Sequence, residues 1–140
     1  MGWRITAQLK DAVEKALQSR IAINSAHLWS DCITALYWIK GEREWSQFVQ
    51  NRVKDILRLT TRENWNQCPG VENPADLGSR GVTATTIKNS RLWWQGPEWL
   101  SRVPEKWPLM NVEPTPESQV EIKASRRVNT LLAAEKKNAA

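Results

Sequence analysis

Two short segments that resemble strands, separated by two segments with the spacing of amphipathic helices, constrain the fold of this chain most. Residues 26–29 (AHLW) and 63–68 (ENWNQC) are interpreted as strands, the second from its alternating polarity. Between them, residues 31–41 and 45–58 carry apolar positions at helical spacing. This order is a βαβ unit, so the two strands should run parallel. Because parallel sheets are normally larger than two strands, the pattern indicates the second half of an α/β domain.

Two of the predicted helices carry amphipathic stripes. Residues 6–20 form the first helix of the chain, and its buried stripe is expected to hold Leu9, Val13, Ala16 and Leu17. In the helix over residues 45–58, the apolar stripe consists of Trp45, Phe48, Val49, Val53, Ile56 and Leu57.

The C-terminal part of the chain changes character twice. A short helix is expected to open at Asn73-Pro74, and residues 83–100 carry another helix-like stretch that ends in LWWQGPEWL. From residue 104 onward, scattered prolines indicate an extended linker. Residues 120–137 are predicted to form an isolated, frayed helix.

Length and composition allow one globular domain with a tail. The chain has 140 residues, of which 41% are hydrophobic, a size that leaves no room for two substantial cores. Its net charge of +5 is compatible with a polyanionic partner such as nucleic acid. The sequence has only two cysteines and no recognisable signal peptide, which favours an intracellular setting, cytoplasmic or nuclear. It also has no apolar run of membrane-spanning length, so no membrane partner is expected.

Asp31 and Asp76 each stand at a structural boundary and each has two interpretations. Asp31 ends a predicted parallel strand, where α/β sheets present ligands, but it is also a good N-cap for the following helix. Asp76 fits the third position of a helix that has Asn73 as N-cap and Pro74 at its first position. From local sequence, a metal-binding role and a capping role both remain open.

Four motifs that follow one another in a characteristic order and spacing bear on the metal-binding interpretation of the two aspartates. They are LWSDCITALYWIKG, WSQFVQNRVKDIL, NPADLGSRG and LWWQGPEWL. The series resembles the ribonuclease H-like region of Pao/BEL-type retrotransposon polyproteins, between the reverse transcriptase and the integrase. The resemblance covers residues 2–100. It implies a partial ribonuclease H-like α/β fold, a truncated mixed sheet with flanking helices, followed by an extended C-terminal tail.

The resemblance also implies a site. In ribonuclease H folds, four carboxylates hold two divalent metals that serve to cleave the RNA strand of an RNA–DNA hybrid. The resemblance places Asp31 at the third carboxylate and Asp76 at the fourth, as catalytic and metal-binding residues. Their oxygen ligands suit Mg²⁺ or Mn²⁺. The expected organisation is a truncated ribonuclease H-like domain over 1–82, a Trp-rich extension over 83–103, and a Pro-containing linker with a frayed helix over 104–140.

The sequence departs from the family pattern at several positions. The first three strands and two of the four carboxylates have no counterpart, and Asp11 and Glu14 are not obvious substitutes. Cys32 stands where the family usually has serine, and no histidine follows Cys68. Together with His27, these cysteines lack the paired spacing of a structural zinc site.

Basic and aromatic residues near the C-terminal motifs suggest contact with nucleic acid. Arg80, Lys88 and Arg91 are the predicted phosphate-binding residues, although Arg80 could equally cap helix carbonyls. The neighbouring Trp93, Trp94 and Trp99 could stack on bases or pack within the protein.

Two functions follow from the sequence. In the first, the chain is a fragment of a retrotransposon-derived polyprotein whose ancestral activity is the hydrolysis of RNA in RNA–DNA hybrids. The isolated chain is expected to be inactive. Its partners would be the hybrid and the rest of the polyprotein. The alternative is a degenerate or domesticated remnant that acts as a nucleic-acid- or protein-binding module. The missing half of the sheet and the basic balance support the alternative.

Overall fold

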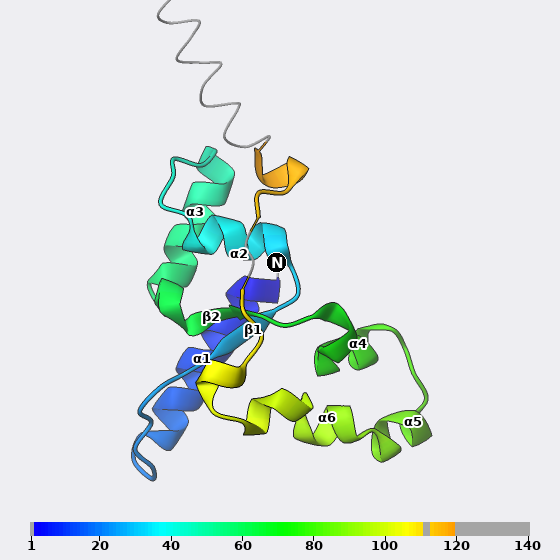
Figure 1. Ribbon diagram of the computed structural model, residues 1–140. Coiled ribbons are helices and arrows are strands. Elements are labelled where there is room, and N and C mark those ends of the chain that lie inside the picture. Colours follow the sequence, from blue (N-terminus) through cyan, green and yellow to red (C-terminus); the bar gives the residue numbers. More distant parts are fainter. Residues whose placement is uncertain (1, 111–112, 120–140) are drawn as a thin grey trace, which may run out of the picture.

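The computed structural model describes residues 2–110 and 113–119, which form a mixed fold of helices and strands (Figure 1). The strands are β1 (Leu28–Ser30) and β2 (Trp65–Gln67). The helices are α1 (Gly2–Leu17), α2 (Ile33–Lys40), α3 (Gln47–Leu57), α4 (Pro74–Ser79), α5 (Ala84–Asn89) and α6 (Arg91–Gln95).

The predicted βαβ unit is confirmed. Strands β1 and β2 pair in parallel, with Leu28 opposite Trp65, and α2 and α3 form the connection between them. Both strands are shorter than predicted. Strand β1 begins at Leu28, and β2 begins only at Trp65 because residues 62–64 turn in a 3-10 helix before it. The Asn64 side chain stabilises this turn by accepting from the Thr61 N–H at 2.9 Å and donating to the Ala26 carbonyl at 3.0 Å.

One face of the sheet carries the main core. Leu28 and Trp65, paired across the strands, are buried against side chains from α1, α2 and α3. The Trp65 indole N–H donates to the Thr60 hydroxyl at 3.0 Å, and that hydroxyl donates to the Ile56 carbonyl at 3.0 Å. The polar edge of the largest core side chain is therefore satisfied inside the protein. The other buried members of this cluster are Ala7, Leu36, Ile39 and Ile56.

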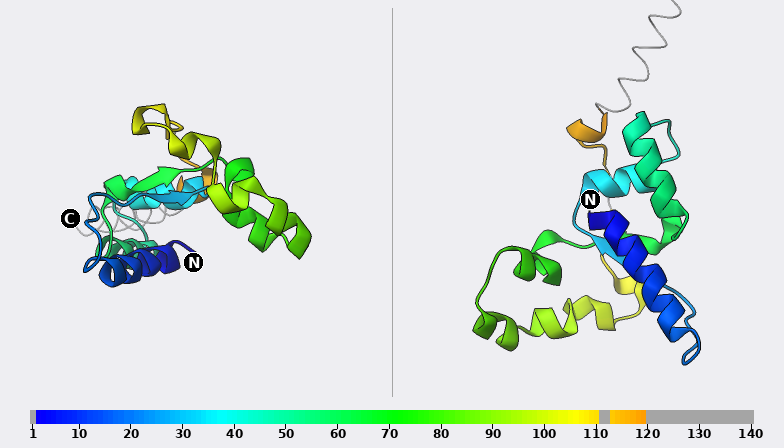
Figure 2. Two further views of the ribbon diagram at one scale, coloured as in Figure 1. Left: turned by 90° about the horizontal axis from the view of Figure 1, so that it is seen from below. Right: turned by 180° about the vertical axis from the view of Figure 1, so that it is seen from behind.

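Tryptophans cover the opposite face of the sheet. Alternation along β1 turns Trp29 away from the main core, and its ring centroid lies 4.8 Å from that of Trp99 and 5.3 Å from that of Trp107. Figure 2 shows α1 on one side of the sheet and the segment around residues 98–107 on the other. The expectation that both faces of a parallel sheet are covered holds here.

Helix α1 differs from its predicted form. It spans Gly2–Leu17 rather than residues 6–20, and its only buried residue is Ala7. Leu9 and Val13, predicted to be buried, are 62% and 45% exposed. The described sheet has no strand beyond β1, so nothing in residues 2–110 and 113–119 covers these two side chains.

The helix over residues 47–57 agrees with its predicted stripe except at Phe48. Val49, Val53 and Ile56 are buried, but Phe48 is 60% exposed. Phe48 precedes Val49 by one residue, a rotation of about 100° around a helix, so it lies beside the line of Val49 and Val53 that packs on α2.

The C-terminal half folds back on the sheet. The helix-like stretch predicted over residues 83–100 is divided at Ser90, which ends α5 and whose side chain accepts from the Trp93 N–H to begin α6. Further on, the Thr115 and Thr34 hydroxyls are 2.7 Å apart, and Ser118 is fully buried. The helix predicted over residues 120–137 lies outside the described residues. In the described part of the chain, every helix is too short or too polar to cross a bilayer.

Replacing Thr60 with valine should destabilise the fold. Thr60→Val keeps the side-chain shape but leaves the buried Trp65 N–H without an acceptor, which costs about 1–3 kcal/mol of unfolding free energy. Urea denaturation followed by tryptophan fluorescence measures this loss. The matched variant Thr85→Val, at an exposed position of α5, should stay within about 0.5 kcal/mol of the parent. Equal stability of the two variants would contradict the assigned role of the Thr60 hydroxyl.

Candidate functional site

Asp31 follows β1 directly but does not cap α2. The N-cap residue of α2 is Cys32, and the side chain of Ser30 accepts the Cys32 N–H at 3.1 Å. The interpretation of Asp31 as an N-cap is therefore wrong, because the backbone of Cys32 is extended and the helix begins one residue later than predicted. The exposed Asp31 carboxylate is left available for another role.

The strand ends bring Asp31 next to the segment that follows β2. The Cys68 N–H donates to the Ser30 carbonyl at 2.9 Å and extends the strand pairing by one step. A Cβ atom placed on Gly70 would lie 3.8 Å from Asp31 Oδ2, in ordinary contact. The carboxylate thus lies beside the turn that begins at Gly70.

Two carboxylates act on one buried thiol in this region. Burial and, to a smaller extent, the negative charges of Glu72 and then Asp31 together raise the pKa of Cys68 to about 11. Glu72 is held in place by the indole N–H of Trp99, which donates to its carboxylate at 2.9 Å. The sequence motifs do not single out Glu72. Its one signal in the sequence is its position directly before the NPAD motif.

Asp76 occupies the helix start that its sequence predicts. Asn73 is the N-cap of α4, and its side chain accepts the Ala75 N–H at 3.1 Å, with Pro74 at the first position. Asp76 lies in the first turn, and its carboxylate forms an ion pair with Arg80 at 2.7 Å between Oδ2 and Nε. Arg80, predicted to bind phosphate, is engaged within its own helix.

The two aspartates follow different strands and do not form a metal site. Asp31 follows β1 directly, whereas Asp76 lies on α4, which comes after β2 and a 3-10 helix over residues 70–72 (Figure 1). Within the described residues, no three His, Cys, Asp or Glu side chains are grouped closely enough to hold a metal ion. Two carboxylates, one of them paired with arginine, do not fit the oxygen-rich ligand set that Mg²⁺ or Mn²⁺ requires.

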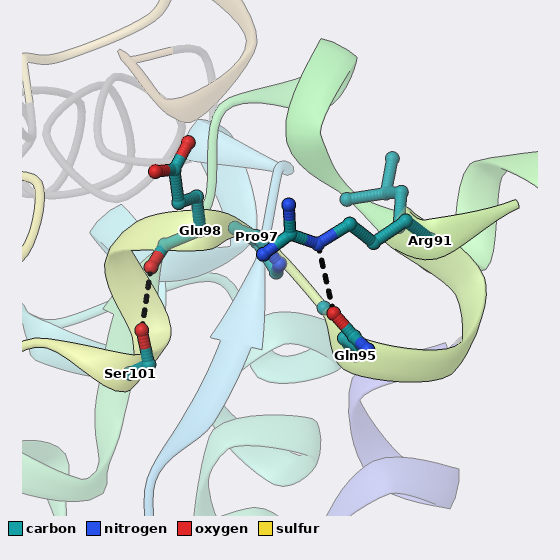
Figure 3. A pocket seen from close by; sticks show the side chains of 7 residues that line it. Arg91, Gln95, Pro97, Glu98 and Ser101 are labelled. Atoms are coloured by element: carbon teal, nitrogen blue, oxygen red, sulfur yellow. Dashed lines mark hydrogen bonds between the residues drawn. The ribbon is translucent and has the colours of Figure 1, made fainter.

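The other predicted basic residues lie on the neighbouring helices. Arg91 and Gln95 line a cavity of about 280 Å³, and the Arg91 Nε donates to Gln95 Oε1 at 2.8 Å (Figure 3). Lys88 is exposed on α5, and its carbonyl accepts the indole N–H of Trp94 at 3.1 Å. Trp94 itself is 68% exposed.

The remaining tryptophans of this region pack within the protein. A Cβ atom on Gly78 would lie 3.3 Å from the Trp93 ring, so that ring packs on α4. Trp99 contacts Trp29 on the sheet. Of the three tryptophans considered for base stacking, Trp94 has the most exposed ring, and both others have packing contacts.

Removing the Asp31 charge should make Cys68 easier to ionise. A carboxylate beside a thiol disfavours the thiolate, so Asp31→Asn should lower the Cys68 pKa and increase its alkylation rate at mildly alkaline pH. The rate with iodoacetamide, measured in a Cys32→Ser background, tests this. Asp11→Asn is the matched control, because Asp11 pairs with Lys15 on α1 and is not among the charges acting on Cys68. An unchanged rate in Asp31→Asn would contradict the placement of this carboxylate.

Comparison with protein families, with curated proteins and with solved structures found no match to this chain.

Proposed function

We propose that this chain is part of a ribonuclease H-like domain of retroelement origin, resembling that of Pao/BEL-type polyproteins, in which Asp31 and Asp76 are two of the catalytic carboxylates. The observation that supports the proposal is the parallel pair β1–β2 with an aspartate beyond the carboxyl end of each strand. Open α/β sheets place ligands at this edge. The substrate would be the RNA strand of an RNA–DNA hybrid.

The surface beside β1 supports the proposal that a further segment of polypeptide completes this domain. Within the described residues, β1 pairs with β2 alone, so its other edge has no strand partner. Next to this edge lies a groove of about 370 Å³ between α1 and β1. Leu9, Val13 and Ile23 line it, all of them exposed, as in a core that lacks one of its layers. The proposed completing segment carries the missing strands and the two missing carboxylates.

Catalysis would depend on this completion. Asp31, Asp76 and the two further carboxylates of the completing segment would together hold Mg²⁺ or Mn²⁺, which would supply the activation of water and the stabilisation of the leaving oxygen. The charges of Asp31 and Glu72 both act on Cys68, while Asp76 would have to exchange Arg80 for a metal ion. The chain by itself lacks the ligand set, so we propose that it is inactive alone.

Extending the chain should test the proposal. The sequence upstream of Met1 in the transcript should encode, in frame, three strands and two further acidic residues. A protein that includes them should cleave the RNA strand of a labelled hybrid with Mg²⁺, and the chain of 140 residues should not. Asp31→Asn and Asp76→Asn in the extended protein should each lower the cleavage rate on the order of a hundredfold.

The matched control in the extended protein is Asp55→Asn, because Asp55 lies on α3 and pairs with Arg58 away from the strand ends. Its cleavage rate should equal that of the parent. Full activity of the Asp31 and Asp76 variants would remove both residues from the catalytic site. An upstream sequence without strands or acids would overturn the proposal for the whole domain.

A second candidate function is nucleic-acid binding without catalysis, and the exposed Trp94 favours it. Trp94 lies three residues beyond Arg91 on α6, and its indole N–H donates to the backbone carbonyl of Lys88, so the exposed ring lies on the part of the chain that carries these two basic residues. Aromatic faces that stack on bases, beside cations that contact phosphates, are the usual means of binding single strands.

The salt dependence of the binding affinity distinguishes nucleic-acid binding from binding of a protein partner. Affinity for a labelled single-stranded oligonucleotide should fall steeply as salt is added, because each phosphate contact releases counterions. Lys88→Gln and Arg91→Gln should each weaken binding and reduce the salt slope by about 0.7. Lys54→Gln, an exposed position on α3, is the control and should leave both unchanged. A flat salt response would exclude phosphate contacts as the source of binding.

A further inference from the structure

A small apolar groove lies between the first three helices, away from the two aspartates. Its volume is about 170 Å³. Trp3 and Arg4 of α1, Trp38 of α2, and Phe48, Arg52 and Ile56 of α3 line it. The wall of the groove is formed by Trp3 and Trp38, whose ring centroids are 5.7 Å apart.

The groove exposes side chains that a protein of this size normally covers. Phe48 is 60% exposed, and the Arg52 guanidinium lies over its ring at 5.1 Å from the centroid. The indole nitrogen of Trp38 is buried without a hydrogen-bond partner. Exposed aromatic patches mark interaction surfaces, and Trp and Arg are the residue types that contribute most to binding at protein interfaces.

The charge at the rim of the groove selects the partner. Arg4 and Arg52 form no ion pair with the described residues, whereas Arg58, Arg80 and Arg102 each have a carboxylate within 4.0 Å. Two unpaired guanidinium groups beside an apolar groove complement a segment that carries carboxylates around an apolar side chain.

We infer that this groove binds an acidic segment of a partner protein that inserts a large apolar side chain between Phe48 and Trp38. The tail of this chain, residues 120–140, is a poor occupant because it has five basic and two acidic residues. Nucleic acid is also disfavoured, because the apolar lining offers few partners for the polar edges of a base. This inference is independent of the proposed nuclease, since it shares no residue with Asp31 and Asp76.

Selection from a displayed library of random peptides, with the full chain as bait, tests the inference. Enriched peptides should combine acidic residues with an aromatic or large aliphatic residue. A synthetic peptide of an enriched sequence should bind in solution. Phe48→Ala and Arg52→Gln should each weaken it about tenfold, and replacing its acidic residues with their amides should have a similar effect.

Lys54→Gln is the matched control, because it removes a cation from the same helix without touching the groove. It should bind the peptide like the parent, and circular dichroism should show that all variants are folded. The inference is overturned by enrichment of peptides without acidic residues, by a lack of any enrichment, or by equal binding to the Phe48→Ala variant. Displacement of the peptide by a single-stranded oligonucleotide from the parent but not from Arg52→Gln would instead assign the groove to nucleic acid.

Discussion

The pairing of Leu28 with Trp65 is the contact on which the other elements depend. It sets the register of the parallel strands, and it places the Trp65 ring where α1, α2 and α3 all reach it. Thr60 satisfies the indole N–H within this core. Because the strands have only three residues each, their few ladder hydrogen bonds cannot hold the sheet alone, and burial of these two side chains supplies most of its stability.

On the reverse face of the sheet, tryptophans provide the cover that helices provide in larger parallel sheets. Trp29 lies between Trp99 and Trp107, so residues far apart in the chain are joined through one ring. Trp99 also donates to Glu72, in the turn that leads to α4. The same ring thereby fixes the C-terminal extension on the sheet and positions an acidic side chain near Asp31. This explains why a chain with nine tryptophans needs so few other aromatic residues.

The features that the sequence predicted correctly are those with local causes. The βαβ order follows from periodicity, and the start of α4 follows from the capping chemistry of Asn73 and Pro74. The predictions of burial were wrong where contacts between residues far apart in the sequence determine whether a side chain is exposed. Leu9 is exposed in the absence of a described strand that covers it, and Phe48 is exposed because it lies beside the line of Val49 and Val53 that packs on α2. For Asp31, the capping role is lost because the helix begins one residue later than predicted, after the extended backbone of Cys32. The nuclease assignment itself rests on resemblance and stays a prediction.

The charges around the two aspartates differ, and this difference bears on how the proposed domain would assemble. Asp76 is neutralised by Arg80, an exposed pair within one helix that contributes little and is easily exchanged. Asp31 instead shares its region with Glu72, and both oppose ionisation of Cys68. A completing segment with two more carboxylates would add to this repulsion, which a divalent cation would relieve. Completion of the domain and cation binding would then stabilise each other, because neither is favourable without the other.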